Sequence, residues 1–120
     1  RISRDDIDYI SLDGLAVDIW DKTEVEAIKT VFGIRAKEIP ASCPKSMFGN
    51  LLGASGVVDL ISTILSMEHG LVAPTINLDE PDPSGLNFVR LKAQPHQINK
   101  ALIISRGRGG INSALVVEKA

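Results

Sequence analysis

The sequence predicts an α/β protein. Segments with the composition of strands alternate with segments that have helical spacing, and the chain closes on two β-rich segments joined by the turn Arg106–Gly110. A further observation is one long apolar segment, which we interpret as a buried helix. Together these patterns favour a sheet that is covered by helices.

The first predicted elements are a strand and an amphipathic helix. Asp8–Leu12 has the composition of a short strand. Asp21–Glu24 has the spacing of a capping box, which predicts that a helix begins there. Apolar residues then recur at helical spacing from Val25 to Phe32, and Gly33 is expected to end the helix.

The middle of the chain predicts a second, longer helix. Glu38–Pro44 is interpreted as a short extended segment, and a helix is predicted from Gly49 to His69. Its apolar residues cover most of its circumference, which is typical of a helix buried on all sides. A chain of 120 residues holds little material to enclose such a helix. The pattern therefore indicates further protein around it, in the same chain or in a partner.

The last part of the chain is predicted to be mostly extended. Leu71–Leu78 is extended, and the prolines and aspartates of Asp79–Gly85 indicate a loop. Lys92–Asn99 shows no pattern. Strands are predicted at Leu86–Arg90, Ala101–Ser105 and Ile111–Lys119.

Composition argues against several classes of function. Hydrophobic residues make up 44% of the chain and charged residues 23%, which is ordinary for a soluble globular protein. The net charge of -2, without a basic stripe, argues against nucleic acid or an anionic membrane as a partner. Asp59 lies in the middle of the most apolar segment, Met47–Met67, and a carboxylate there disfavours a membrane-spanning helix.

The cysteine and the histidines indicate neither a disulfide nor a metal site. Cys43 is the single cysteine and cannot form a disulfide within the chain, so a reducing compartment, the cytoplasm, is expected. His69 and His96 lack metal-ligand spacing to each other and to Cys43. The chain starts on Arg1 and not on methionine, which suggests a fragment, a processed piece or a trimmed chain.

Three segments together resemble one protein family. They read DKTEVEAIKTVFG, PKSMFGNLLGASGVVDLISTILSMEHGLVAPTINLDEPD and ISRGRGGINSALVVEK. In order and spacing they are similar to the C-terminal half of the β-ketoacyl-acyl carrier protein synthases, the condensing enzymes of fatty acid and polyketide synthesis. For residues 1–120 the resemblance implies half of a thiolase-type fold, with a mixed sheet packed between helices and one central buried helix. The N-terminal half of that fold is absent from this chain.

The resemblance also implies where the family's catalytic residues belong. The synthases use a cysteine nucleophile in the N-terminal half and two histidines in the C-terminal half, which polarise the thioester carbonyl of the malonyl unit. The first histidine begins a His-Gly-Thr motif, where this sequence has Asp13–Leu15. The second ends a Lys-Ser-x-x-Gly-His motif, where this sequence keeps Lys45, Ser46 and Gly49 but has Asn50.

A third departure lies in the glycine-rich turn. Synthases carry a pair of phenylalanines there, where this sequence has Arg106 and Arg108 beside Gly107, Gly109 and Gly110. An Asp-Gly pair with an Arg-Gly-Arg turn resembles the chain length factors, the non-catalytic ketosynthase homologues of type II polyketide systems. Such proteins pair with an active ketosynthase and help to shape the tunnel that sets product length.

Each of these residues also has a structural interpretation. Asp13 is equally a turn residue before Gly14, Lys45 a solvated surface lysine and Asn50 a polar residue at a helix start. If the arginines of the turn lie close to Asp13, their charge stabilises its ionised form and holds the altered pocket together.

The competing hypothesis for function is an enzyme: a divergent β-ketoacyl-acyl carrier protein synthase or a malonyl decarboxylase. Under either hypothesis we expect no cofactor and no metal. The expected partners are the N-terminal half of the protein, a catalytic ketosynthase subunit and an acyl carrier protein, whose bound thioesters would be the substrates of the assembly.

Overall fold

A mixed sheet lies at the centre of the fold. The structure is a computed structural model that describes residues 1–81, 83 and 85–120, apart from the side chain of Arg108. The sheet has five strands in the order β4-β2-β1-β6-β7. Neighbouring strands are parallel except β7, which is antiparallel to β6. The strands are β1 (Tyr9–Ser11), β2 (Pro40–Ser42), β4 (Asn87–Phe88), β6 (Lys100–Arg106) and β7 (Asn112–Glu118).

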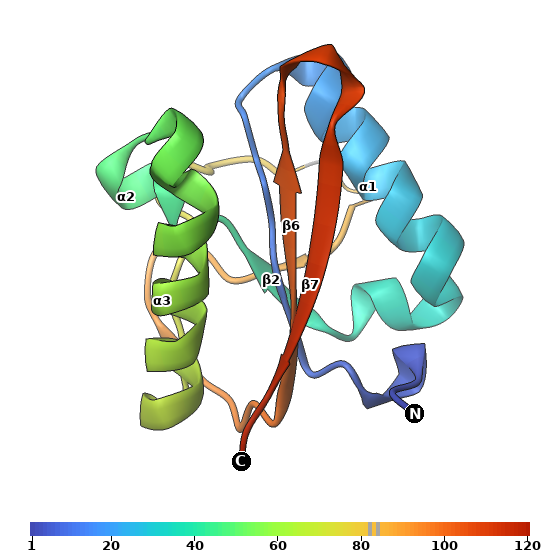
Figure 1. The fold of residues 1–120 in the computed structure, drawn as a ribbon, viewed down its shortest axis with the longest axis vertical. Coiled ribbons are helices and arrows are strands. Elements are labelled where there is room, and N and C mark those ends of the chain that lie inside the picture. Colours follow the sequence, from blue (N-terminus) through green and yellow to red (C-terminus); the bar gives the residue numbers. More distant parts are fainter. Residues whose placement is uncertain (82, 84) are drawn as a thin grey trace.

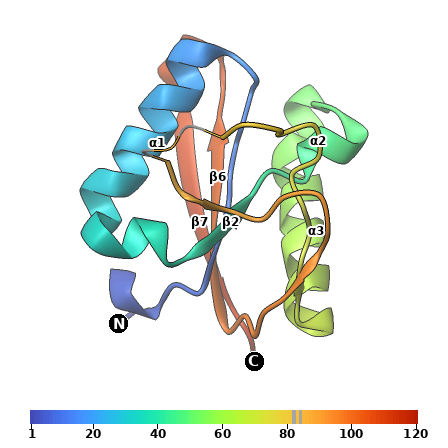
Figure 2. The same cartoon turned by 180° about the vertical axis from the view of Figure 1, so that it is seen from behind.

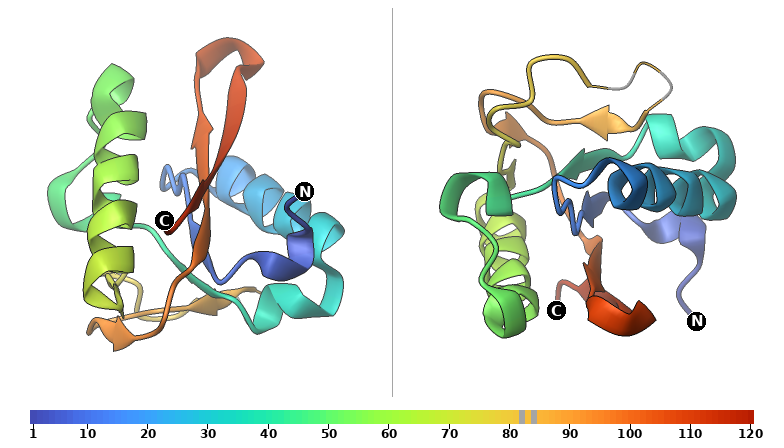
Figure 3. Two further views of the ribbon diagram at one scale, coloured as in Figure 1. Left: turned by 60° about the horizontal axis from the view of Figure 1, so that its bottom comes forward. Right: turned by 90° about the horizontal axis from the view of Figure 1, so that it is seen from above.

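Helices cover both faces of this sheet. Helix α1 (Asp18–Phe32) lies on one side and α3 (Ser55–His69) on the other, with the short helix α2 (Lys45–Phe48) before α3 (Figure 1). The view from behind shows the same two-sided arrangement (Figure 2). From above, the chain forms three layers, helix, sheet and helix (Figure 3). The predicted α/β class is therefore confirmed.

The strand predictions are confirmed in place but not in length. Four of the predicted segments each contain one strand of the central sheet, namely Asp8–Leu12, Glu38–Pro44, Leu86–Arg90 and Ile111–Lys119. The fifth, Ala101–Ser105, lies within the longer strand β6. A second sheet pairs β3 (Leu71–Val72) with β5 (Gln94–Pro95), and β5 falls in a segment that shows no strand pattern in the sequence. The predicted loop Asp79–Gly85 extends outside the described residues.

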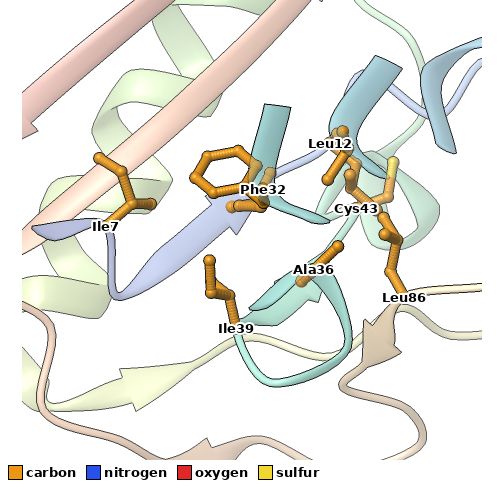
Figure 4. Close-up of a cluster of buried hydrophobic side chains, with 10 residues drawn as sticks. Ile7, Leu12, Phe32, Ala36, Ile39, Cys43 and Leu86 are labelled. Carbon is orange, nitrogen blue, oxygen red and sulfur yellow. The ribbon is translucent and has the colours of Figure 1, made fainter. Parts of the chain in front are cut away.

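Side chains of the central strands alternate between two buried clusters. Ile10 faces the α1 side, where it packs with Ile28 and Phe32, whereas Tyr9 faces the α3 side and packs with Met67. Figure 4 shows the α1-side cluster, including Ile7, Leu12, Phe32, Ala36, Ile39, Cys43 and Leu86. A parallel strand buried on both faces carries an almost continuous apolar run, which explains the strand signal at Asp8–Leu12.

The predicted start of the first helix is wrong. Helix α1 begins at Asp18, so Asp21 and Glu24 lie inside it and do not cap it. Their carboxylates instead accept hydrogen bonds from backbone N–H groups of the preceding loop, Asp21 from Leu15 and Glu24 from Asp13. The same residue types, Asp and Glu, occur in a capping box and in a helix whose side chains accept hydrogen bonds from the preceding loop. The predicted end is confirmed, since Gly33 closes α1 with φ of 58°.

The predicted helix Gly49–His69 is also wrong at its beginning. Gly49 adopts φ of 88° and ends α2, a short 3₁₀ turn follows at Leu52–Ala54, and α3 starts only at Ser55. The apolar periodicity of the sequence continues across Gly49, but the helical backbone does not. The glycine takes a conformation that does not occur inside a helix.

Helix α3 presents its polar side to the sheet and its apolar side outward. The buried residues facing inward are Ser55, Asp59, Thr63, Ser66 and Met67. On the outer side, the exposed fraction is 61% for Val57 and 51% for Ile61. Within this chain, α3 is therefore not buried on all sides. Its burial in a larger assembly stays a prediction.

Candidate functional site

The candidate site lies where parallel strands end. Asp13 follows β1, Lys45 follows β2 and Arg106 is the last residue of β6. Loops at the carboxyl ends of parallel strands meet at one edge of a sheet, which is where α/β proteins usually bind ligands. This edge lies opposite both chain termini (Figure 1).

Asp13 is buried between two cations. Its side chain is 4% exposed, with Oδ1 at 3.4 Å from Lys45 Nζ and Oδ2 at 3.4 Å from Arg106 Nε. Its backbone carbonyl also accepts a hydrogen bond of 2.9 Å from Lys45 Nζ. The predicted pairing of Asp13 with an arginine of the glycine turn is therefore present for Arg106. The side chain of Arg108 lies outside the described part of the chain.

Lys45 is not a surface lysine. Its side chain is 4% exposed, and its Nζ lies 2.8 Å from Oδ2 of Asp59, a residue with no exposed surface. Burial lowers the pKa of Lys45, but the hydrogen bond and charge of Asp59, together with Asp13, outweigh it and leave that pKa raised. Burial raises the pKa of Asp59, and Lys45 only partly opposes this. The pair is a buried ion pair that joins α2 to α3.

Asp59 and Glu24 complete the site, and the sequence patterns did not predict the role of either. Glu24 is buried on α1, and its carboxylate accepts from the N–H groups of Asp13 at 2.8 Å and Gly14 at 3.0 Å. Burial raises the pKa of Glu24, while these two N–H groups and Arg106 lower it in part. Each carboxylate lies on the buried face of its own helix, Glu24 on α1 and Asp59 on α3. This spacing could have indicated that both need buried partners.

Arg106 links the site to the start of α1. Its Nη2 lies 3.5 Å from Oε2 of Glu24, and its Nη1 donates a hydrogen bond of 2.8 Å to the carbonyl of Trp20. The turn that follows Arg106 is closed by a hydrogen bond of 2.7 Å from Gly107 N–H to the carbonyl of Ile111. In this turn Gly109 and Gly110 have φ of 79° and 81°.

Asn50 takes part in a local cap and not in the charged cluster. It is exposed, and its Oδ1 accepts from Leu52 N–H at 2.9 Å and from Ser55 Oγ at 2.8 Å. Within the described residues, no hydrogen bond joins Asn50 to Asp13, Lys45 or Arg106. The interpretation as a polar residue at a helix start therefore matches its contacts.

Cys43 fills space beside the site. Its Sγ lies 3.6 Å from the carbonyl oxygen of Gly14, and burial raises the pKa of its thiol to about 11. Gly14 has φ of +48°, and a Cβ at this residue would lie 2.6 Å from Cys43 Sγ. Gly14 is therefore required by its backbone conformation and by the sulfur behind it.

The charged cluster joins the loop after β1, helix α2, helix α1 and the end of β6. The carboxylate oxygens of Asp13 are acceptors, and they contact the cationic groups of Lys45 and Arg106. Among the residues that the structure describes, no group of three or more His, Cys, Asp or Glu side chains is arranged to hold a metal ion. No helix in the described ranges has the length and apolarity needed to cross a membrane.

Comparison with known proteins identifies the family. Residues 1–79 match the family described as beta-ketoacyl synthase, C-terminal domain. The chain belongs to this family. The alpha ketoacyl synthase subunit of the tetracenomycin polyketide synthase of Streptomyces glaucescens is 38% identical over 120 residues, covering 99% of this chain and 28% of that protein. The 3-oxoacyl-[acyl-carrier-protein] synthase 2 of Staphylococcus aureus is 42% identical over 115 residues, covering 95% of this chain and 28% of that protein.

Solved structures of ketosynthases share the fold. A type II polyketide ketosynthase in complex with its acyl carrier protein and bound to a hexaketide matches with a TM-score of 0.95 and 35% identity, over 99% of this chain and 29% of that chain. The ishigamide ketosynthase/chain length factor matches with a TM-score of 0.93 and 32% identity over the same shares. The thiolase-like fold is thus confirmed, and this ketosynthase-like chain spans less than a third of the length of these relatives.

Proposed function

We propose that this chain is part of a chain length factor, a ketosynthase-like subunit that pairs with an active ketosynthase and shapes the tunnel for the growing acyl chain. The observation that carries the proposal is the state of Asp13. By the resemblance described above, it takes the position of the first histidine in the synthase motif, and in the structure it is buried with a cation on either side.

A carboxylate there is unsuited to condensation. The thioester oxygen gains negative charge as the malonyl unit loses CO₂, and a hydrogen-bond donor is needed at that point. An ionised carboxylate has no proton to donate and adds negative charge. Loss of one such donor lowers a rate by about 10²–10³. By the same resemblance, Asn50 takes the position of the second histidine as well.

The outer face of α3 supports the inference that further protein surrounds this chain. Val57, Ile61, Ile64 and Leu65 form a row of exposed apolar side chains on one helix, and such rows mark surfaces that other protein covers. We infer that the N-terminal half of the protein covers this face and that a ketosynthase and an acyl carrier protein complete the assembly. The proposed assembly is cytoplasmic and needs no cofactor.

The test uses the full-length protein co-expressed with a catalytic ketosynthase. Native mass measurement should find a 1:1 complex, and the purified subunit alone should form no β-ketoacyl product from acyl and malonyl thioesters on acyl carrier protein. An active homodimer that ignores the ketosynthase contradicts the proposal.

A divergent synthase or malonyl decarboxylase is the second candidate. It is favoured by the names of the relatives described above, which are synthases, and by the retained Lys45. The residue at the nucleophile position of the N-terminal half separates the two functions: cysteine favours the enzyme, and glutamine or another substitute favours the partner. Release of CO₂ from malonyl-acyl carrier protein measures the decarboxylase activity directly.

A further inference from the structure

Arg106 connects three parts of the chain that are far apart in sequence. It ends β6, and its guanidinium reaches the carboxylate of Asp13, the carboxylate of Glu24 and the carbonyl of Trp20. A planar guanidinium presents its N–H groups in a fixed fork, so a single side chain can hold several acceptors in defined directions. Lysine has no such fork.

The neighbouring surface makes this connection important. Helix α1 and the β6–β7 hairpin flank a mostly apolar groove of about 430 Å³, lined by residues such as Ala27, Val31 and Leu102. Glu24 and Arg106 face each other across the end of this groove nearest the glycine turn. At that end, the polar contacts of Arg106 tie the hairpin to the helix.

Arg106 balances the negative charge of the carboxylates that it contacts. Glu24 and Asp13 face it directly, and the more distant groups of the same cluster are Lys45 and Asp59, with the thiol of Cys43 beside them. Removal of the arginine would leave buried carboxylates with Lys45 as the neighbouring cation. An uncompensated buried charge is costly, and the carboxyl group takes up a proton to avoid it.

We propose that Arg106 is a clamp that fixes the glycine turn Gly107–Gly110 to the β1–α1 loop and to the first turns of α1, and that it requires its positive charge to do so. A turn with this much glycine has many accessible backbone conformations, so its order depends on anchors at its ends. The clamp operates whether the assembly is a chain length factor or an enzyme, so its test is independent of the proposed function.

The test compares variants of the full-length protein. Arg106→Met removes the charge and keeps the length, and Arg106→Lys keeps the charge and removes the fork. Arg90→Met is the matched control, because Arg90 is an exposed arginine that donates to the carbonyls of Leu78 and Asp79. Backbone hydrogen exchange in the glycine turn should be about tenfold faster in Arg106→Met and unchanged in Arg90→Met.

The pH dependence of stability tests the charge requirement. In Arg106→Met, Glu24 loses a cation that lowers its pKa, so the folded protein should bind the Glu24 proton more tightly and the loss of stability should be larger at pH 8 than at pH 5.5. Adding Asp13→Asn should recover part of the loss at pH 8. If Arg106→Met does not fold, recovery of folding by Asp13→Asn supports the proposal and failure to recover contradicts it. Unchanged exchange in the turn, or an equal loss at both pH values, overturns it.

Discussion

At the scale of single residues, tight packing decides which substitutions the site tolerates. Gly14→Ala should lower the free energy of unfolding by about 2–4 kcal/mol, because the new methyl group meets Cys43 Sγ and the residue keeps a left-handed backbone. Gly33→Ala is the control, since Gly33 also has positive φ but has no atom within 4 Å of the place that a new methyl group would take. It should cost only about 1–2 kcal/mol.

Chemical denaturation of the full-length variants measures both costs. Adding Cys43→Ala to Gly14→Ala should recover part of the loss by removing the sulfur. Equal effects at Gly14 and Gly33 would show that the contact with Cys43 does not matter.

The buried pair of Lys45 and Asp59 gives a second prediction. Lys45→Met should cost about 3–5 kcal/mol, because it leaves Asp59 buried without its cation. The double variant Lys45→Met with Asp59→Leu should recover most of this loss, since an apolar pair of similar volume replaces the charges. Thermal unfolding of the single and double variants checks this, and a double variant no better than Lys45→Met contradicts it.

Glu24 gives a prediction about pH. Its raised pKa means that the folded protein binds this proton more tightly than the unfolded chain. The contribution of Glu24 is therefore full below the ordinary glutamate pKa and declines as pH rises through the raised value. Glu24→Gln removes the decline, so its destabilisation should be larger at pH 4 than at pH 7. Denaturant titrations at both pH values measure the destabilisation by Glu24→Gln. A larger destabilisation at pH 7 than at pH 4 contradicts the prediction.

At the scale of elements, the sequence could place helices and strands but not all of their ends. The spacing of Val25 to Phe32 predicts α1, and Gly33 predicts its end. The start is ambiguous because an aspartate and a glutamate three residues apart suit a capping box as well as contacts with a preceding loop. Only the position of the β1–α1 loop decides between them. Apolar spacing likewise cannot show that Gly49 interrupts the backbone.

Helix α3 yields a prediction about its outer face. Ile61→Asp in the full-length protein should greatly reduce soluble expression, because we expect this face to be covered by the rest of the assembly. Ile34→Asp is the control. Ile34 is 85% exposed and lies in a 3₁₀ turn away from that row, so the same substitution should have little effect. Soluble yield and native mass compare the two. A soluble, folded Ile61→Asp variant contradicts the expected burial.

At the scale of the whole molecule, the sequence predicted the α/β class and, through its resemblance to the synthases, the thiolase-like fold. Asp13, Lys45 and Arg106 were predicted as site positions, and the structure brings these three residues together, whereas the predicted Asn50 lies outside the cluster. The partners Asp59 and Glu24 were not predicted. Ion pairs between distant segments depend on the order of the strands in the sheet. The pattern of residues in a single sequence does not give that order.

Cys43 makes this site observable without a substrate. The chain has one thiol, which is 7% exposed and lies against the carbonyl oxygens of Asp13 and Gly14. A reagent that alkylates thiols should reach it when the structure around it opens, for example by movement of the β1–α1 loop, and burial raises the pKa of the thiol to about 11. The rate at which Cys43 is labelled therefore reports local opening around it, including movement of the loop that carries Asp13. A partner that binds at this edge of the sheet would slow the labelling. The fraction of alkylated Cys43, measured over time, would therefore report its binding.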